Sequence, residues 1–423
     1  MNAVPERTVI VNCVAFTGDE VVDDAVVEIA DGRVAGIGAR PPGFRPATAR
    51  GAGVTVLDVE GAIVAPGFVD IQVNGGGDVL FNDEPTVEAI RAIAEAHARF
   101  GTTSIVPTYI TGPVETMHTA LAAALRAHAE DPSGILGVHF EGPAISRLRS
   151  GVHDPSFILD AFPLEVLAKL PGPGTGSPVV VVTLAPEVAG IETVRALRDR
   201  GVVVSVGHSD ASFEQAMQAF DAGATCVTHL FNGMSPLTAR APGVVGAALA
   251  APGPWVGLIA DGHHCHPGAL RTAIEAKPAS RCILVTDAMP PAGGSLTRFT
   301  LGPYRIEVHG GRCTVANDPS PTSASLDSAA SPTADRDPNV PKVAGTLAGS
   351  TLDMASAVRF CVTHLGVSLY DALRMASLHP SQLLGLDTRI GRIRRGHIAN
   401  LVVIEPAMDV VGTVRAGRVV LDH

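Results

Sequence analysis

Aromatic residues, basic clusters and paired cysteines are all scarce in this sequence, and each shortage narrows the class of protein. Only 4% of the 423 residues are aromatic although 46% are hydrophobic, so the core must rely on Val, Ala, Leu and Ile. That composition is typical of parallel strands buried on both faces. The formal net charge of -11, without a Lys/Arg cluster, argues against nucleic acid as a partner because phosphate backbones need a basic face.

The cysteines and the apolar runs exclude further classes. The six cysteines are scattered without a CxxC pair, so neither a disulfide framework nor a zinc knuckle is indicated. No apolar run approaches the ~20 residues needed to span a bilayer, and no charged-then-apolar signal segment is visible at the start. We therefore expect a cytoplasmic protein with no membrane partner.

Both ends of the chain carry short strand patterns. Residues 25–29 and 33–37 are apolar alternations that flank Asp31-Gly32, which is a hairpin signal. The same kind of pattern returns at residues 400–404 and 412–420. Because 423 residues exceed what one simple core usually carries, we predict a small β-sandwich domain formed by both termini, residues 1–61 and 390–423.

Between these ends, strand patterns alternate with helical ones. Residues 86–100 have helical periodicity that stops at Gly101, and residues 103–107 then read as a strand. The alternation recurs through the apolar runs 135–138, 179–184, 202–206, 224–228, 255–259 and 282–286. Repeated β-α units of this number predict an α/β fold with a (β/α)8 TIM-like barrel over residues 62–389.

One segment within the predicted barrel domain has a different composition. Ser, Pro, Ala, Thr and Asp dominate residues 317–341. Such a segment cannot bury a hydrophobic face, so we expect a surface insertion, whose function the sequence does not indicate.

Three apolar runs end in side chains that can bind a metal. His208 follows the run 202–206, His229 follows 226–228, and a third run ends in His139-Phe140-Glu141-Gly142-Pro143. Because strand ends converge on one face of a barrel, we expect Glu141, His208 and His229 to meet there. Two imidazoles and a carboxylate leave an open position on zinc, which is the ligand set of a catalytic site. The alternative is that all three are ordinary polar residues at strand ends.

Seven segments, in a fixed order along the chain, resemble one family. They are Pro66-Gly67-Phe68-Val69-Asp70, His139-Phe140-Glu141-Gly142-Pro143, Gly207-His208-Ser209, Thr228-His229-Leu230-Phe231-Asn232-Gly233-Met234, Ala260-Asp261-Gly262-His263-His264, Val285-Thr286-Asp287-Ala288 and Gly345-Thr346-Leu347-Ala348-Gly349-Ser350. Together they are similar to the N-acetylglucosamine-6-phosphate deacetylases of the amidohydrolase superfamily. The resemblance runs from about the first hairpin to the C-terminus, and the ordered set is specific although each motif alone is weak.

The resemblance implies a reaction and a general base. Family members hydrolyse N-acetyl-D-glucosamine 6-phosphate to D-glucosamine 6-phosphate and acetate, with a metal-bound water held here by Glu141, His208 and His229. A metal lowers the pKa of its water toward ~7 and so supplies hydroxide at neutral pH. Asp287 matches the base that takes the proton of this water and returns it to the departing amine. Judged from the residues alone, a helix N-cap is an equal alternative for Asp287.

The predicted first barrel strand departs from the wider superfamily. Most amidohydrolases carry His-x-His where this chain has Gln72-Val73-Asn74, and neutral amide oxygens are weaker ligands for a transition metal. We therefore predict that Gln72 and Asn74 lie near the metal without binding it. Each subunit then holds one divalent metal, zinc, with iron, cobalt or manganese as alternatives. A subset of the deacetylase family shares this Gln-x-Asn pattern.

The resemblance also implies contacts with the acetyl group and the phosphate. His153 matches the position that polarises the acetyl carbonyl in relatives with one metal, and an exposed loop histidine is the alternative. Asn232 and the backbone N–H of Gly233 match phosphate contacts. Arg240 matches an arginine that reaches the phosphate in the neighbouring subunit, which predicts a homodimer with shared sites.

A smaller set of positions matches contacts with the sugar. His264 matches a histidine that contacts the sugar, and Leu347 and Ala348 lie in the segment that closes over the acetamide. The partner implied by the whole set is therefore a small amino-sugar phosphate.

Two other functions stay open. One is a different amidohydrolase acting on a cyclic amide or a nucleobase, although such enzymes usually keep His-x-His and lack this phosphate set. The other is a sugar-phosphate-binding protein without catalysis. The joint presence of Glu141, His208, His229 and Asp287 argues against it, because losing any one would disable catalysis.

Overall fold

The computed structural model describes residues 7–43, 53–169, 174, 176–317 and 344–420. Its centre is a sheet of eight parallel strands in the order β15-β14-β13-β12-β11-β10-β9-β6. A parallel bridge between Val73 and Ala288 brings the two ends of this order together into a nearly closed barrel. The strands are β6 (Phe68–Val73), β9 (Thr102–Ile110), β10 (Gly137–Glu141), β11 (Val179–Leu184), β12 (Val203–Val206), β13 (Cys226–Val227), β14 (Trp255–Leu258) and β15 (Cys282–Leu284).

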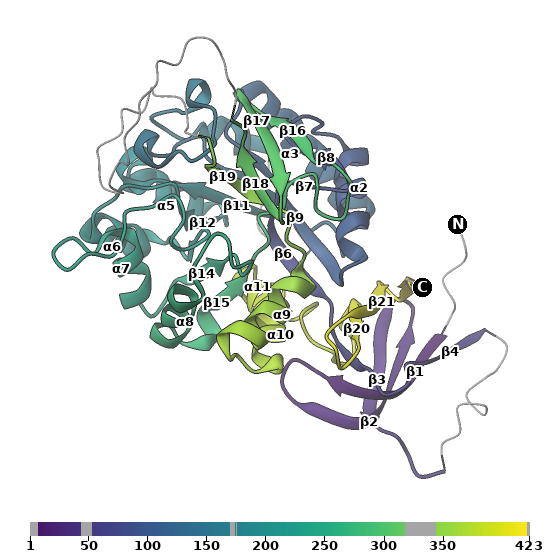
Figure 1. Ribbon diagram of the computed structural model, residues 1–423. Helices are drawn as coiled ribbons and strands as arrows, with labels where there is room; N and C mark the ends of the chain where they lie inside the picture. Colours follow the sequence, from purple (N-terminus) through teal and green to yellow (C-terminus); the bar gives the residue numbers. More distant parts are fainter. Residues whose placement is uncertain (1–6, 44–52, 170–173, 175, 318–343, 421–423) are drawn as a thin grey trace.

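Helices surround this barrel (Figure 1). They are α2 (Val87–Ala98), α3 (Val114–Glu130), α4 (Pro186–Ala189), α5 (Ile191–Asp199), α6 (Phe213–Ala222), α7 (Gly243–Ala250), α8 (Pro267–Ala276), α9 (Met354–Leu365), α10 (Leu369–Ala376) and α11 (Leu378–Leu383). The helix predicted at residues 86–100 is confirmed as α2, and the Thr86 side chain accepts from Ala89 N at its start. A hydroxyl at this position satisfies an N–H group that has no partner within the helix. Three short 3-10 helices, Arg147–Arg149, Pro155–Phe157 and Leu164–Lys169, lie between β10 and β11.

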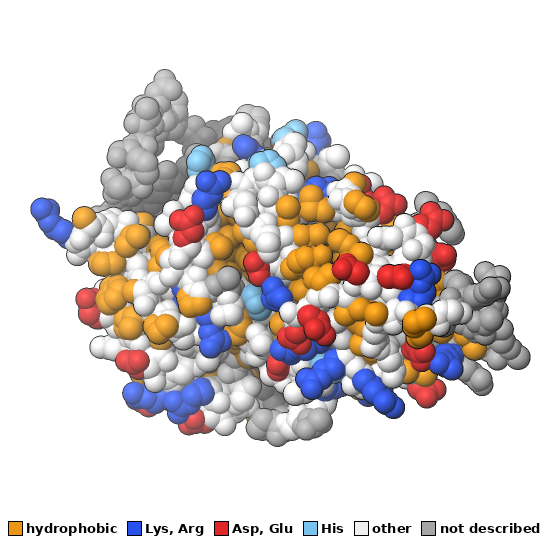
Figure 2. Space-filling view, turned by 90° about the horizontal axis from the view of Figure 1, so that it is seen from below, with side chains coloured by type: hydrophobic (Ala, Val, Ile, Leu, Met, Phe, Trp, Pro, Cys, Tyr) orange, Lys and Arg blue, Asp and Glu red, His pale blue; other side chains and the backbone are white. Residues whose placement is uncertain are grey.

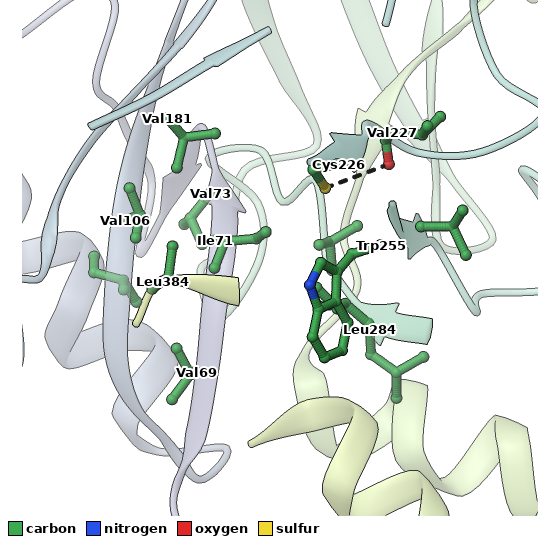
Figure 3. Packing of buried hydrophobic residues seen from close by; sticks show 14 of the residues in the cluster. Val69, Ile71, Val73, Val106, Val181, Cys226, Val227, Trp255, Leu284 and Leu384 are labelled. Atoms are coloured by element: carbon green, nitrogen blue, oxygen red, sulfur yellow. Dashed lines mark hydrogen bonds between the residues drawn. The ribbon is translucent and has the colours of Figure 1, made fainter. Parts of the chain in front are cut away.

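Branched aliphatic side chains fill the barrel and the layer between strands and helices. Figure 3 shows Val69, Ile71 and Val73 of β6 packed near Val106 of β9 and Val181 of β11. All nine residues of β9 are buried, as a strand covered on both faces requires. Each fully buried Val or Ile contributes about 1.5–3 kcal/mol relative to exposure, so a core without many aromatic rings still stabilises a rigid scaffold.

A second sheet joins the two ends of the chain. Its order is β22-β21-β20-β5-β1-β2-β3, and β4 pairs with the first half of β1, on the same edge as β5. The strands are β1 (Arg7–Phe16), β2 (Val21–Ala30), β3 (Arg33–Ala39), β4 (Val54–Asp58), β5 (Ile63–Pro66), β20 (Leu401–Ile404), β21 (Val410–Arg415) and β22 (Arg418–Val420). The predicted hairpin is confirmed: β2 pairs with β3 antiparallel, and Asp31 and Gly32 between them both have positive φ, as a tight hairpin turn demands.

The predicted fold class, a TIM-like barrel with a small β domain built from both termini, is therefore confirmed. The domain limits at 61/62 and 389/390 stay predictions. The predicted insertion, residues 317–341, lies outside the described residues except for Asn317.

Two smaller sheets were not expected from the sequence. A four-stranded antiparallel sheet contains β16 (Arg298–Leu301), β17 (Tyr304–His309), β18 (Arg312–Val315) and β19 (Leu347–Ser350). A bridge between Ala288 and Ser350 attaches it to the barrel just beyond β15. The strands β7 (Gly75–Gly76) and β8 (Val79–Leu80) form a short hairpin after β6.

The described surface agrees with the composition. Figure 2 shows acidic and basic side chains interspersed on one face of the molecule, rather than gathered by sign. Among the described helices, none is long and apolar enough to cross a bilayer.

Candidate metal centre and active site

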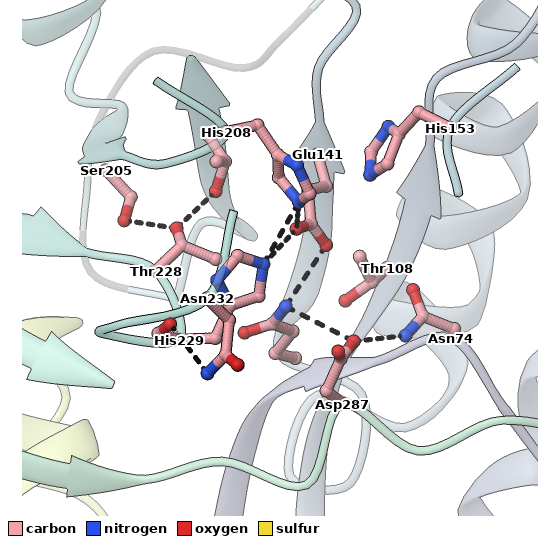
Figure 4. Close-up of polar contacts among 12 residues, drawn as sticks. Asn74, Thr108, Glu141, His153, Ser205, His208, Thr228, His229, Asn232 and Asp287 are labelled. Carbon is pink, nitrogen blue, oxygen red and sulfur yellow. Dashed lines mark hydrogen bonds and ion pairs between the residues drawn. The ribbon is translucent and has the colours of Figure 1, made fainter. Parts of the chain in front are cut away.

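Four polar side chains lie where barrel strands end. Glu141 is the last residue of β10, His208 and His229 follow β12 and β13, and Asp287 follows β15. The backbone turns sharply at three of them, since φ is 46° at His208, 30° at His229 and 51° at Asp287. Positive φ is unfavourable for residues with a Cβ and is common where a site dictates the backbone. The turns direct these side chains toward one another at the mouth of the barrel (Figure 4).

Glu141, His208 and His229 form a compact group that we call the Glu-His-His cluster. Glu141 Oε1 lies 2.9 Å from Nε2 of each histidine, and the two Nε2 atoms are 3.0 Å apart. All three residues are buried. Among the described residues, this is the one group of three or more His, Cys, Asp or Glu side chains close enough to share a metal ion. The predicted ligands are thus brought together.

The hydrogen bonds behind the cluster show that its donor atoms fit a cation. His208 Nδ1–H donates to the carbonyl oxygen of Arg149, at 2.8 Å. A histidine that binds a metal must be neutral, and with its one proton on Nδ1 the ring would present the Nε2 lone pair to the ion. Two acceptors facing each other at 2.9 Å are stabilised by a shared cation, and a backbone carbonyl behind the ligand ring is typical of metal-bound histidine. Two nitrogens and one oxygen suit zinc and leave a further position open.

The electrostatics of the cluster favour a carboxylate that stays ionised. Burial alone would raise the pKa of Glu141, but its contacts with His208 and His229 outweigh burial and hold that pKa well below its usual range. Burial likewise lowers the pKa of His229, while the bond to Glu141 more than compensates and raises it. The ionised Glu141 carboxylate therefore offers a negative oxygen to a cation bound at the cluster.

The first barrel strand contributes two amides, and their nitrogens point at carboxylates. Gln72 Nε2 donates to Glu141 Oε2 at 3.1 Å and to Asp287 Oδ1 at 3.3 Å. Asn74 Nδ2 donates to the same Asp287 oxygen at 2.7 Å. These donors orient Asp287 beside the Glu-His-His cluster. An N-cap role for Asp287 is wrong, because no helix begins there.

Burial changes the proton affinity of Asp287. It raises the pKa of this carboxyl to about 6, and repulsion from Glu141 adds to the effect. A carboxyl with a pKa near neutrality is suited to exchanging protons with a reacting group. The geometry therefore offers a proton-transfer group directly across from a candidate metal centre.

Two further predicted histidines lie close to this centre. His153 is only 3% exposed, so the alternative of an exposed loop histidine is wrong. Its ring centroid is 4.3 Å from that of His208, and its Nδ1 lies 2.7 Å from Thr111 Oγ1. His264 Nδ1 lies 2.6 Å from Asp261 Oδ2, and that contact holds the His264 ring in place.

The three residues predicted to bind phosphate, Asn232, Gly233 and Arg240, have different surroundings in the structure. Asn232 donates its amide N–H groups to the carbonyls of His229 and Leu230, so this side chain braces its own loop. Gly233 packs against His208: a Cβ there would lie 3.0 Å from the ring Nδ1. Arg240 is exposed on the loop before α7.

The residues predicted to close over the acetamide belong to β19. Leu347 and Ala348 lie in this strand, whose Ser350 bridges to Ala288 directly after Asp287. A Cβ on the intervening Gly349 would lie 2.8 Å from Asp287 O, so glycine permits this close approach. The small antiparallel sheet thus reaches the catalytic edge of the barrel.

Several residues of this site were not found from the sequence. Thr111 contacts His153, and Glu187 accepts from Ser209 Oγ at 2.7 Å and Asp210 N at 2.6 Å, directly behind His208. Thr111 lies directly after β9 and Glu187 lies in the short helix α4, and neither belongs to a recognisable motif. Their one signal is position, since each follows a barrel strand within a few residues.

A barrel of parallel strands that presents a carboxylate and two imidazoles at its carboxyl edge defines a class, the metal-dependent hydrolases of barrel fold. A comparison with models of protein families identifies which family of such hydrolases the chain matches. The model of the Amidohydrolase family matches residues 63–420. The chain belongs to the amidohydrolase family.

Its relatives include sugar-phosphate deacetylases. The chain is 34% identical to N-acetylglucosamine-6-phosphate deacetylase of Haemophilus influenzae over 97% of this chain and 98% of that protein. It is 38% identical to N-acetylgalactosamine-6-phosphate deacetylase of a Shewanella species over 85% and 83% of the two chains. A structure of a Mycobacterium smegmatis N-acetyl-D-glucosamine-6-phosphate deacetylase, an Asp→Ala variant in complex with N-acetyl-D-glucosamine-6-phosphate, aligns with a TM-score of 0.83 and 31% identity, covering 99% and 100%.

Proposed function

We propose that this protein hydrolyses the acetamide of N-acetyl-D-glucosamine 6-phosphate to D-glucosamine 6-phosphate and acetate. One observation carries the proposal. The Glu-His-His cluster and Asp287 converge at the carboxyl edge of a barrel whose chain aligns almost end to end with deacetylases of this substrate. The acid–base group and the donors for a metal are thus both present in one buried site.

The cluster is proposed to hold one divalent metal, zinc, with iron, cobalt or manganese as alternatives. When bound, such an ion polarises water and an amide carbonyl, so that attack becomes feasible at neutral pH. Gln72 and Asn74 turn their N–H groups toward carboxylates, which leaves no histidine pair on β6 for a second ion. We therefore expect one equivalent of metal per chain, and two equivalents of zinc in active protein would contradict this.

The chain's own residues then carry the protons. Asp287 accepts the proton of the attacking water and delivers it to the departing amine nitrogen of the sugar. Asn74 and Gln72 hold its Oδ1 in place, at 2.7 and 3.3 Å, so that Oδ2 is directed at the reacting atoms. His153 donates a hydrogen bond to the acetyl oxygen as negative charge develops on it. His264, Leu347 and Ala348 are proposed to contact the sugar and its acetamide.

The test is acetate release by metal-loaded protein. Wild type should turn over this sugar, and Asp287→Asn should lose roughly 10²–10⁴-fold in kcat while keeping its metal. Asp131→Asn, which changes an aspartate on the opposite side of the barrel beside Arg415, should behave as wild type. Wild type that binds metal but releases no acetate would refute the proposed substrate.

The epimeric sugar is a second candidate, because the Shewanella relative is an N-acetylgalactosamine-6-phosphate deacetylase. The two substrates differ in the orientation of one hydroxyl group. Measuring kcat/KM for both in the same preparation decides between them. A higher value for the galacto epimer would reassign the substrate and leave the site and reaction unchanged.

Phosphate recognition is proposed to use two subunits. The side-chain N–H groups of Asn232 already donate to carbonyls of its own loop. We therefore propose that Asn232 contacts the phosphate only in combination with the neighbouring backbone N–H of Gly233. The exposed Arg240 then reaches the phosphate of the neighbouring subunit in a homodimer. Mixing Arg240→Ala with Asp287→Asn subunits should restore about a quarter of wild-type activity, because each mixed dimer contains one complete site. No recovery from mixed dimers would show that Arg240 does not act in trans.

A further inference from the structure

The side chain of Thr111 contacts three residues of the site, His153, Glu141 and Gly142. It follows the last residue of β9 and is only 5% exposed. Its Oγ1 is 2.7 Å from His153 Nδ1 and 3.4 Å from the carbonyl oxygen of Glu141. The same hydroxyl occupies the space beside Gly142, where a Cβ would overlap it. The Thr111 hydroxyl therefore lies between the His153 ring and the backbone of Glu141 and Gly142.

The two distances decide where the hydroxyl proton goes. A threonine hydroxyl has one proton to donate, and O–H donors ordinarily lie 2.5–3.0 Å from their acceptors. The contact with His153 falls in this range, whereas the one with Glu141 O does not. When Thr111 donates along this shorter contact, to His153 Nδ1, that nitrogen carries the lone pair of the ring.

The proton of a neutral His153 is then confined to Nε2. An imidazole that accepts at Nδ1 keeps its one N–H on the other nitrogen. Figure 4 shows the ring beside Glu141, across the Glu-His-His cluster from His229. A donor fixed in advance at such a position stabilises developing negative charge without reorganising during the reaction.

We propose that Thr111 is a positioning residue that sets the tautomer of His153 and so makes it a hydrogen-bond donor to the acetyl oxygen of the substrate. This inference rests on the proposed deacetylase function. It adds Thr111 to the residues that determine turnover, although Thr111 itself does not contact the reacting atoms.

Three variants separate this role from a packing role. Thr111→Val keeps the shape and removes the hydroxyl, and Thr111→Ser keeps the hydroxyl. Thr111→Val should lower kcat by roughly 10- to 1000-fold, with KM and metal content within about twofold of wild type. Thr111→Ser should stay within about threefold of wild type in kcat. Thr119→Val, which removes an exposed hydroxyl on α3, is the matched control and should not change kcat.

A double variant shows whether the two residues act together. If Thr111 works through His153, adding Thr111→Val to His153→Ala should lower kcat by no more than about twofold beyond His153→Ala alone. Multiplying effects would overturn the inference, as would a Thr111→Val enzyme with wild-type kcat.

Histidine ¹⁵N NMR of the zinc-loaded protein reads the tautomer directly, with His153→Ala assigning the signal. We expect an Nε2–H ring in wild type and in Thr111→Ser, and loss of that preference in Thr111→Val. An Nδ1–H ring in wild type would refute the inference. This measurement needs no substrate, so it judges Thr111 even if wild type releases no acetate, an outcome that would refute the proposed function alone.

Discussion

Asp70 is expected to make the stability of this protein fall as pH rises through neutrality. It lies in β6, fully buried, with Oδ2 accepting from Thr286 Oγ1 at 2.5 Å and Oδ1 accepting from Gln72 N at 3.2 Å. Burial raises its pKa from an ordinary 3.8 to about 7, although these donors oppose the shift. Replacing Asp70 with Asn removes the titrating group at nearly constant volume.

The sign and size follow from proton linkage. Between pH 3.8 and 7 the folded protein keeps a proton on Asp70 that the unfolded chain has released. Stability due to this group is therefore fully present below pH 3.8 and is lost as pH rises to about 7. Each pH unit corresponds to about 1.4 kcal/mol, so wild type should lose on the order of 3 kcal/mol between pH 5 and pH 7.5 relative to the variant.

Denaturant unfolding of both proteins at a series of pH values measures this difference. The free energy of unfolding of Asp70→Asn minus that of wild type should increase with pH by the stated amount and level off above pH 7.5. Asn cannot accept all the hydrogen bonds that Asp70 accepts. This loss shifts the difference in the free energy of unfolding by a constant amount, so the dependence of that difference on pH is unchanged. A difference that does not vary with pH would refute the reasoning, because it would mean that Asp70 is ionised in the folded state throughout.

Three further predictions concern the site. Asn74→Leu should lower kcat by roughly 10- to 100-fold with metal retained, because Asp287 loses a charge-assisted hydrogen bond; unchanged steady-state kcat would contradict an orienting role for the amide. Chelation should lower the free energy of unfolding, and zinc restored at 100 times its Kd should raise it by about 2.7 kcal/mol; a Tm independent of zinc would argue against binding at the cluster. Glu187→Gln should weaken metal affinity by about 10-fold or more in a competition titration, because it loosens the loop after His208; Glu192→Gln, on an exposed helix, should match wild type, and equal affinities for both variants would exclude that support.

The barrel was predictable because its signals are local and repeated. Strands covered on both faces need continuous apolar runs such as residues 179–184, and helix starts need caps such as Thr86. The convergence of the Glu-His-His cluster was predictable for a related reason, since strand ends of a barrel share one edge regardless of sequence separation. Glu141 and His229 are 88 residues apart along the chain, yet lie 2.9 Å apart in the fold.

Contacts that depend on loop conformation could not be predicted. The carbonyl of Arg149 orients His208 through its backbone, and a backbone oxygen leaves no mark in the sequence. The contacts of Thr111 with His153 and of Glu187 with Ser209 join segments that follow different barrel strands. The antiparallel sheet β16–β19 was missed because its last strand, Leu347–Ser350, pairs with β18 across a long separation in the sequence.

The pairing of β5 with β20 has a consequence for synthesis. Pro66 faces Leu401 across this pair, so one edge of β5 has no partner until the end of the chain is made. At roughly 5–20 residues per second, a ribosome needs on the order of 20–70 s to cover that interval. During this time an apolar strand edge is open to other nascent chains, which is a known route to aggregation. Production at lower temperature or with added chaperones should therefore raise the yield of folded protein, and truncation before Leu401 should abolish it.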